Sequence, residues 1–80
     1  MNEAEIKERV TEIFKDVLDD DDIELFRETT AADIEDWDSL NHISLIVAIE
    51  NEFKTKFELT EIKQLRDVGD MLDLILRKIS

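Results

Sequence analysis

Apolar residues recur at helical spacing near the start of the chain. They fall at i, i+4, i+7, i+8 and i+11, which places them on one face of an α-helix. Charged side chains fill most of the other positions, so the helix depends on burying its apolar face. The pattern predicts an amphipathic helix from Glu3 to Leu18 whose buried residues are Ile6, Val10, Ile13, Phe14 and Val17.

A second stretch, from Asp38 to about Phe53, is apolar around more than half of a helical circumference. This predicts a central, mostly buried helix. Its apolar positions are Leu40, Ile43, Leu45, Ile46, Val47, Ile49 and Phe53. The remaining strip is small, polar and mostly uncharged, and consists of Asn41, Ser44, Ala48, Asn51 and Glu52.

A third apolar stripe predicts a helix from Val68 to Ile79, with Asp67 as its cap. Before it, Thr60 is suited to cap a short helix from Glu61 to about Leu65. The connection over residues 19–37 is long and acidic, and its anchors on the core are expected to be Ile23, Leu25 or Phe26, Ile34 and Trp37. The expected fold is therefore an all-α, small four-helix bundle, three main helices plus one short helix, in a single domain over residues 1–80.

Composition narrows the class of protein. The chain has no cysteine, which excludes disulfides and thiolate metal sites, and its formal net charge is −12. Nucleic acids and anionic membranes repel such a polyanion, whereas basic protein surfaces attract it. There is no signal-peptide pattern and no apolar run long enough to span a bilayer. We expect a soluble, cytoplasmic monomer whose charge either attracts basic proteins or only maintains solubility.

The centre of the chain holds the candidate chemistry. Asp38 is a good N-cap, and Ser39 then takes the first helical position. A phosphate attached to the Ser39 hydroxyl would lie where backbone N–H groups and the helix dipole favour negative charge. Most Asp-Ser pairs at a helix start are ordinary caps and carry no chemistry, so the pair taken alone favours capping.

Asp38-Ser39-Leu40, followed by an apolar helix ending in Glu50-Asn51-Glu52-Phe53, resembles the attachment site of acyl carrier proteins. The resemblance runs from about Ile6 to Ile79. It implies that Ser39 carries a 4′-phosphopantetheine arm, added by a phosphopantetheinyl transferase, and that the arm carries an acyl chain as a thioester. The chain would then deliver that acyl group to acyl-transferring and acyl-modifying enzymes with basic surfaces.

Further roles follow from the same resemblance. It implies a partner-binding surface formed by Glu35, Asp36, Asp38, Leu40, Asn41, Ser44, Glu50 and Glu52. The side chains expected to open around an acyl chain are Leu45, Ile49, Phe57, Ile62 and Leu65. Asn41 and Ser44 stand where many fatty-acid carriers have acids, and Trp37 stands where a glycine is common. These departures favour a dedicated carrier in a specialised pathway of fatty-acid, lipid or polyketide-type biosynthesis.

Other functions remain open. The first alternative is a carrier of an aminoacyl or short hydroxyacyl group. The second is an unmodified acidic helical adaptor for basic proteins, which would not need Ser39 at all. A hydrolase built from Ser39, His42 and Asp38 is disfavoured, because Asp38 is occupied with capping and no glycine-rich turn offers an oxyanion hole. We expect His42 to be a partly exposed helix residue and Trp37 a hydrophobic anchor.

Metal binding is not indicated by the acidic run at residues 19–22. An EF-hand loop starting at Asp20 would require glycine at its sixth position and glutamate at its twelfth. Leu25 and Ala31 stand there instead. The sequence thus predicts no metal site and no catalytic residue, and leaves open weaker binding of Ca²⁺ or Mg²⁺ by the acidic loop.

Overall fold

The computed structural model describes residues 2–79 and is helical throughout its regular elements. The order is α1 (Glu3–Leu18), the 3-10 turn η1 (Ala31–Asp33), α2 (Ser39–Phe53), α3 (Leu59–Lys63) and α4 (Val68–Ile79). Three long helices and one short one confirm the expected all-α class. The predicted bounds of α1 and α4 are confirmed, and so are the caps of α2 and α4.

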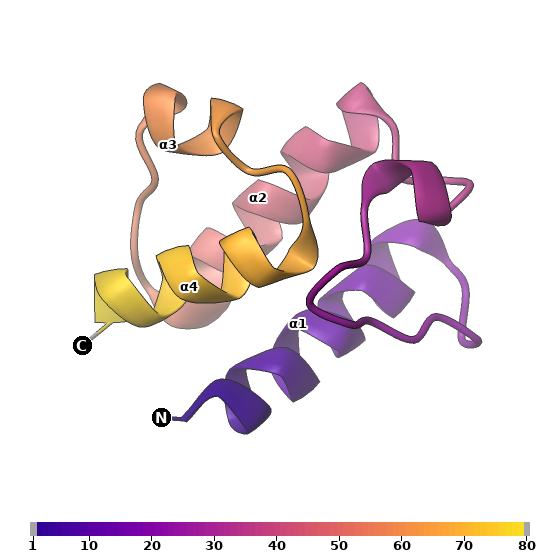
Figure 1. The fold of residues 1–80 in the computed structure, drawn as a ribbon, viewed down its shortest axis with the longest axis horizontal. Helices are drawn as coiled ribbons and strands as arrows, with labels where there is room; N and C mark the ends of the chain where they lie inside the picture. The colour runs from indigo at the N-terminus through magenta and orange to yellow at the C-terminus, as the bar shows by residue number, and fades with distance from the viewer. Residues whose placement is uncertain (1, 80) are drawn as a thin grey trace.

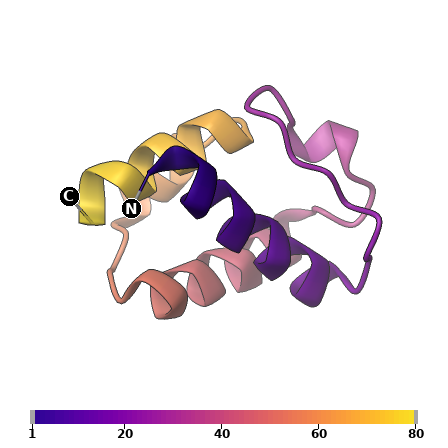
Figure 2. The same ribbon diagram turned by 90° about the horizontal axis from the view of Figure 1, so that it is seen from below.

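Helix α1 packs against both α2 and α4 (Figures 1 and 2). Ile6, Val10 and Phe14 of the predicted stripe are buried, and Leu18, which was not predicted, is buried with them. Ile13 and Val17 of that stripe are only partly buried against the core. The first turn of α1 and the last turn of α4 lie at the same end of the bundle (Figures 1 and 2). The attachment sequence lies at the other end, where the long connection enters α2.

The prediction that α2 is mostly buried is wrong for one of its sides. Leu45, Ile46, Ile49 and Phe53 are buried, but Leu40, Ile43 and Val47 are 78%, 53% and 49% exposed. Periodicity gives the spacing of apolar residues but not the number of neighbours available to cover them. The main packing contacts of α2 are with α1. The side of α2 that faces away from α1 therefore remains in solvent.

The predicted bounds of α3 are also wrong. The helix begins two residues before the predicted Glu61 and is capped by Glu58 rather than Thr60. The N–H of Glu58 donates to Oε1 of Glu61 at 2.8 Å, and the Glu58 side chain caps in return. This reciprocal capping box satisfies two helix-end donors, which a single threonine cap does not.

The long connection is held by its own apolar anchors. Ile23, Leu25 and Trp37 are buried and Ile34 is partly buried, as predicted. Of the two candidates at residues 25 and 26, Leu25 is the anchor, since Phe26 is 51% exposed beneath the ammonium of Lys7. A long loop packed by its own side chains fits the expectation for such a small domain.

The connection is also fastened to the start of α4. The N–H groups of Val68 and Gly69 donate to the carbonyls of Thr29 and Arg27 at 2.9 and 2.8 Å. A Cβ on Gly69 would lie only 3.0 Å from the Arg27 carbonyl oxygen, so glycine permits this close approach. The Arg27 guanidinium then pairs with Glu3 of α1 and with Asp73 of α4.

Candidate functional site

Ser39 is the first residue of α2 and is exposed. Asp38 precedes it in extended conformation, and its Oδ1 accepts the N–H of Asn41 at 2.8 Å. Capping is therefore performed by Asp38, and the Ser39 hydroxyl is not needed for it. An exposed hydroxyl at the N-terminus of a long helix meets the requirement for a phosphate-linked group, because the dipole and the first-turn N–H groups favour negative charge there.

The backbone leading to Ser39 turns tightly. The N–H of Trp37 donates to the Ile34 carbonyl and that of Asp38 to the Asp36 carbonyl, both at 3.1 Å. The Asn41 side-chain amide also donates to the Asp36 carbonyl, at 2.7 Å. Asn41 is thus partly buried and engaged within the protein, although the sequence placed it on a free partner-facing strip.

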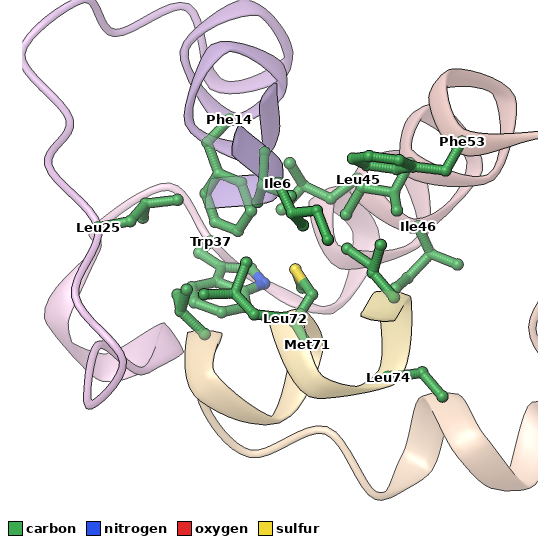
Figure 3. Packing of buried hydrophobic residues seen from close by; sticks show 14 of the residues in the cluster. Ile6, Phe14, Leu25, Trp37, Leu45, Ile46, Phe53, Met71, Leu72 and Leu74 are labelled. Carbon is green, nitrogen blue, oxygen red and sulfur yellow. The ribbon is translucent and has the colours of Figure 1, made fainter. Parts of the chain in front are cut away.

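Trp37 anchors this turn in the core, as the sequence predicts. It is 6% exposed, and its ring meets that of Phe14 edge-on at a centroid distance of 5.0 Å (Figure 3). Its Nε1–H donates to Nδ1 of His42 at 3.0 Å, and the two rings stack at 6.0 Å. The hydrogen bond joins the connection to the first turn of α2.

His42 is partly buried, and this burial lowers its pKa because desolvation disfavours the charged form. An indole N–H only donates, so Nδ1 of His42 must be unprotonated and the ring proton lies on Nε2. In a hydrolase triad the acid would instead hold Nδ1–H. Asp38 caps the helix, so the geometry gives the triad no support.

The outward face of α2 is a mainly apolar surface beside Ser39. At about 100° per residue, it is formed by the exposed residues Leu40, Ile43, Ser44, Val47 and Asn51. Exposed acids, Glu35, Asp36 and Asp38, lie just before it in the chain. The acids farther along α2 are engaged within the protein: Glu52 pairs with Arg9 at 2.8 Å, and Glu50 accepts the N–H of Phe57 at 2.8 Å.

The five residues predicted to open around an acyl chain belong to the core or its edge. Leu45, Ile49 and Phe57 are buried in the core, and Ile62 and Leu65 are partly buried at its edge. Leu65 also lines a hollow between α3 and α4, whose other walls are mostly charged. Their role in holding an acyl chain stays a prediction.

Comparisons with known proteins agree with this geometry. The family described as the phosphopantetheine attachment site matches residues 8–75. An acyl carrier protein of Thermosynechococcus vestitus is 36% identical over 80 residues, which cover 100% of this chain and 99% of that protein. One from Petrotoga mobilis is 31% identical over the same length, covering 94% of that protein.

A solved structure is similar as well. The solution structure of the holo acyl carrier protein from Geobacter metallireducens has a TM-score of 0.87 and 49% identity, covering 92% of this chain and 85% of that chain. The fold and the site thus define a phosphopantetheine-dependent carrier. The chain belongs to the acyl carrier protein family, whose prosthetic group is phosphopantetheine. In the described residues 2–79, no helix is long and apolar enough to cross a membrane.

Two features of the site were missed by reasoning from the sequence. The exposure of Ile43 and Val47 had no signal, because an apolar position looks the same whether or not another helix covers it. Leu40, by contrast, was placed on the partner-binding surface by the family resemblance. The Trp37–His42 bond had a weak signal: a tryptophan just before a cap and a histidine one turn into the helix lie within reach, but only the path of the connection brings them together.

Proposed function

We propose that Ser39 carries the 4′-phosphopantetheine arm and that the chain carries acyl groups as thioesters without catalytic activity of its own. The arm supplies the thiol that forms the thioester. The observation that carries the proposal is the exposed Ser39 hydroxyl at the N-terminus of α2, in a chain of this family. Asp38 frees that hydroxyl by capping the helix, and Trp37 fixes the backbone that leads to it.

Partner recognition divides between two surfaces. The exposed acids Glu35, Asp36 and Asp38 attract basic residues of a phosphopantetheinyl transferase or an acyl-processing enzyme. The outward face offers an apolar centre where those enzymes can exclude water, as interface centres usually do. Glu50 and Glu52 contribute less, because each already has a partner within the protein.

The cargo and pathway are part of the proposal rather than of the family assignment. Ser44 places a neutral group on the outward face. Trp37 anchors the turn through its side chain, which a glycine at that position could not do. Both favour a carrier dedicated to a specialised biosynthetic pathway. An aminoacyl or short hydroxyacyl cargo is the competing assignment, and the mass of the group carried by protein from its native host distinguishes them.

The experiment that tests attachment is intact mass after incubation with coenzyme A and a broad-specificity phosphopantetheinyl transferase. The parent chain should gain the mass of one arm and Ser39→Ala should gain none. Ser44→Ala is the matched control, since it removes the other serine hydroxyl near the start of α2 and should leave the gain intact. A gain in Ser39→Ala, or no gain in the parent, contradicts the proposal.

A further inference from the structure

Trp37 and His42 form a side-chain bridge around Ser39. Ser39 follows Trp37 by two residues and precedes His42 by three, so the hydrogen bond closes a short loop of chain that contains the serine. The pair is separate from the helix cap, which Asp38 supplies. It joins the end of the connection to the first turn of α2.

The two sides of this loop are held in different ways. On the solvent side, the Asp38 carboxylate and the Asn41 amide make hydrogen bonds to backbone groups. On the core side, Trp37 lies against Phe14, and Figure 3 shows its ring near Leu72 and Met71 of α4. Only the core-side bridge contains a group that changes its charge near neutral pH, which is His42.

We propose that the Trp37–His42 hydrogen bond is a latch that positions Ser39 for attachment of the arm, and that protonation of His42 opens it. The inference rests on the proposed role of Ser39 in one respect, the effect on attachment. The latch itself is a property of the unmodified chain and is measurable there. His42 acts as a positioning residue through Trp37.

Protonation removes the acceptor on which the latch depends. Neutral His42 accepts the indole N–H at Nδ1, whereas the imidazolium carries a proton on both nitrogens. Two donors would then face each other, and the buried indole N–H would lose the partner that it has within residues 2–79. An unpaired buried donor costs more free energy than a formed hydrogen bond contributes. We therefore expect the Trp37 ring to move toward solvent, where water can accept its N–H.

The surroundings of the bridge are mainly apolar. Phe14 of α1 and Met71 and Leu72 of α4 contribute no charge, and the acids adjacent in the chain are Asp36 and Asp38. Burial lowers the pKa of His42, and no charged side chain is a cause of that shift. The latch is therefore closed at neutral pH and opens on acidification, at a pH below the ordinary pKa of a histidine.

The sequence makes the spectroscopic test direct, because the chain has one tryptophan and one histidine. Trp37 fluorescence and the imidazole nitrogen shifts of the unmodified chain are followed from about pH 8 to pH 5. We expect the fluorescence transition and the His42 titration to share one midpoint, with the ring proton on Nε2 above it. His42→Gln, whose side-chain oxygen accepts without titrating, should lose the transition. An Nδ1-protonated neutral ring, or a transition retained in His42→Gln, overturns the latch.

The functional test compares rates of arm attachment at the same transferase concentration. At pH 7.5, His42→Leu should be modified roughly two- to tenfold more slowly than the parent, the range that one hydrogen bond typically sets. His42→Gln should recover most of the loss. The ratio of parent to His42→Leu rates should approach one as the pH falls through the His42 midpoint. Taking this ratio removes the pH dependence of the transferase itself.

A stability control separates positioning from general weakening of the fold. Ile75→Val truncates a fully buried residue of α4 and lowers stability, while it leaves both side chains of the bridge in place. It should be modified at the parental rate. Equal rates for the parent and His42→Leu at pH 7.5, or a similar loss in Ile75→Val, overturn the positioning role. A parent chain that takes up no arm overturns the proposed function instead, and the spectroscopic result on the unmodified chain then decides the latch.

Discussion

The inward and outward faces of α2 carry similar side chains in different surroundings. Inward, Leu45, Ile46, Ile49 and Phe53 meet α1 and the rest of the core and are at most 9% exposed. Outward, Leu40, Ile43 and Val47 are at least 49% exposed. Burial of an aliphatic side chain contributes about 1.5–3 kcal/mol to stability, and the outward residues do not obtain it. The apolar residues of the inward face stabilise the fold, whereas those of the outward face are available to bind a partner.

The largest expected effect is on stability. Ile49→Ala should lower the free energy of unfolding by about 2–5 kcal/mol, since Ile49 is fully buried and the cavity will not fill completely. Ile43→Ala is the matched variant on the outward face and should change it by less than about 0.5 kcal/mol. Urea unfolding of both variants measures the contrast. Similar losses of unfolding free energy would show that the outward face contributes to stability as much as the inward face does.

The second effect appears in partner reactions. Ile43→Ala should lower kcat/KM for arm attachment about fivefold, which corresponds to about 1 kcal/mol at an interface centre. Asn51→Ala is the control, because it lies on the same face at the end of α2 remote from Ser39. If Asn51→Ala lowered kcat/KM for arm attachment as much as Ile43→Ala, the apolar residues near Ser39 would not contribute more to partner binding than the rest of the outward face.

The contrast also shows what the sequence can and cannot determine. Helical spacing was sufficient for the bounds of α1 and α4, and the Asp38 cap was readable from its residue type. The bounds of α3 depended on which of Glu58 and Thr60 caps it, and residue type alone favoured Thr60, whereas the reciprocal Glu58–Glu61 capping box forms instead. Exposure of Ile43 depends on which helices pack together, and this is a property of the whole fold.

His42 lies at the boundary between the two faces and should give a smaller, pH-dependent effect. Its folded-state pKa is lowered, so the unfolded chain binds the proton more readily. The resulting stability is complete above the ordinary histidine pKa of about 6.5 and is lost as the pH falls toward the lowered value. Relative to His42→Gln, the parent should therefore lose stability on acidification from about pH 7 to pH 5. Urea midpoints of both chains at each pH measure this difference in stability. Because both chains have the same carboxylates, the contribution of carboxylate titration cancels. A constant difference would contradict the shift.

The smallest expected effect concerns the charge of the outward face. Ser44 is exposed there, and Ser44→Glu should increase the rate with a generic fatty-acid ketosynthase about two- to threefold at low salt, because an added acid attracts the basic surface of the enzyme. No charged residue lies three or four positions from Ser44, since those positions are Leu40, Asn41, Val47 and Ala48. The substitution thus creates no new charge pair within the helix. Asn41→Asp is unsuitable, because it would remove the amide that donates to the Asp36 carbonyl.

The comparison requires arm-bearing chains with the same acyl load, and Ser44→Gln as a neutral control of similar size to glutamate. The gain of Ser44→Glu over Ser44→Gln should shrink as salt is added, because the Debye length is about 10 Å at 0.1 M and about 3 Å at 1 M. A gain that persists at 1 M salt would mean that the new side chain acts by direct contact. Equal rates for both variants at low salt would remove the argument that a neutral outward face restricts this carrier to a specialised pathway, while leaving the assignment of Ser39 unaffected.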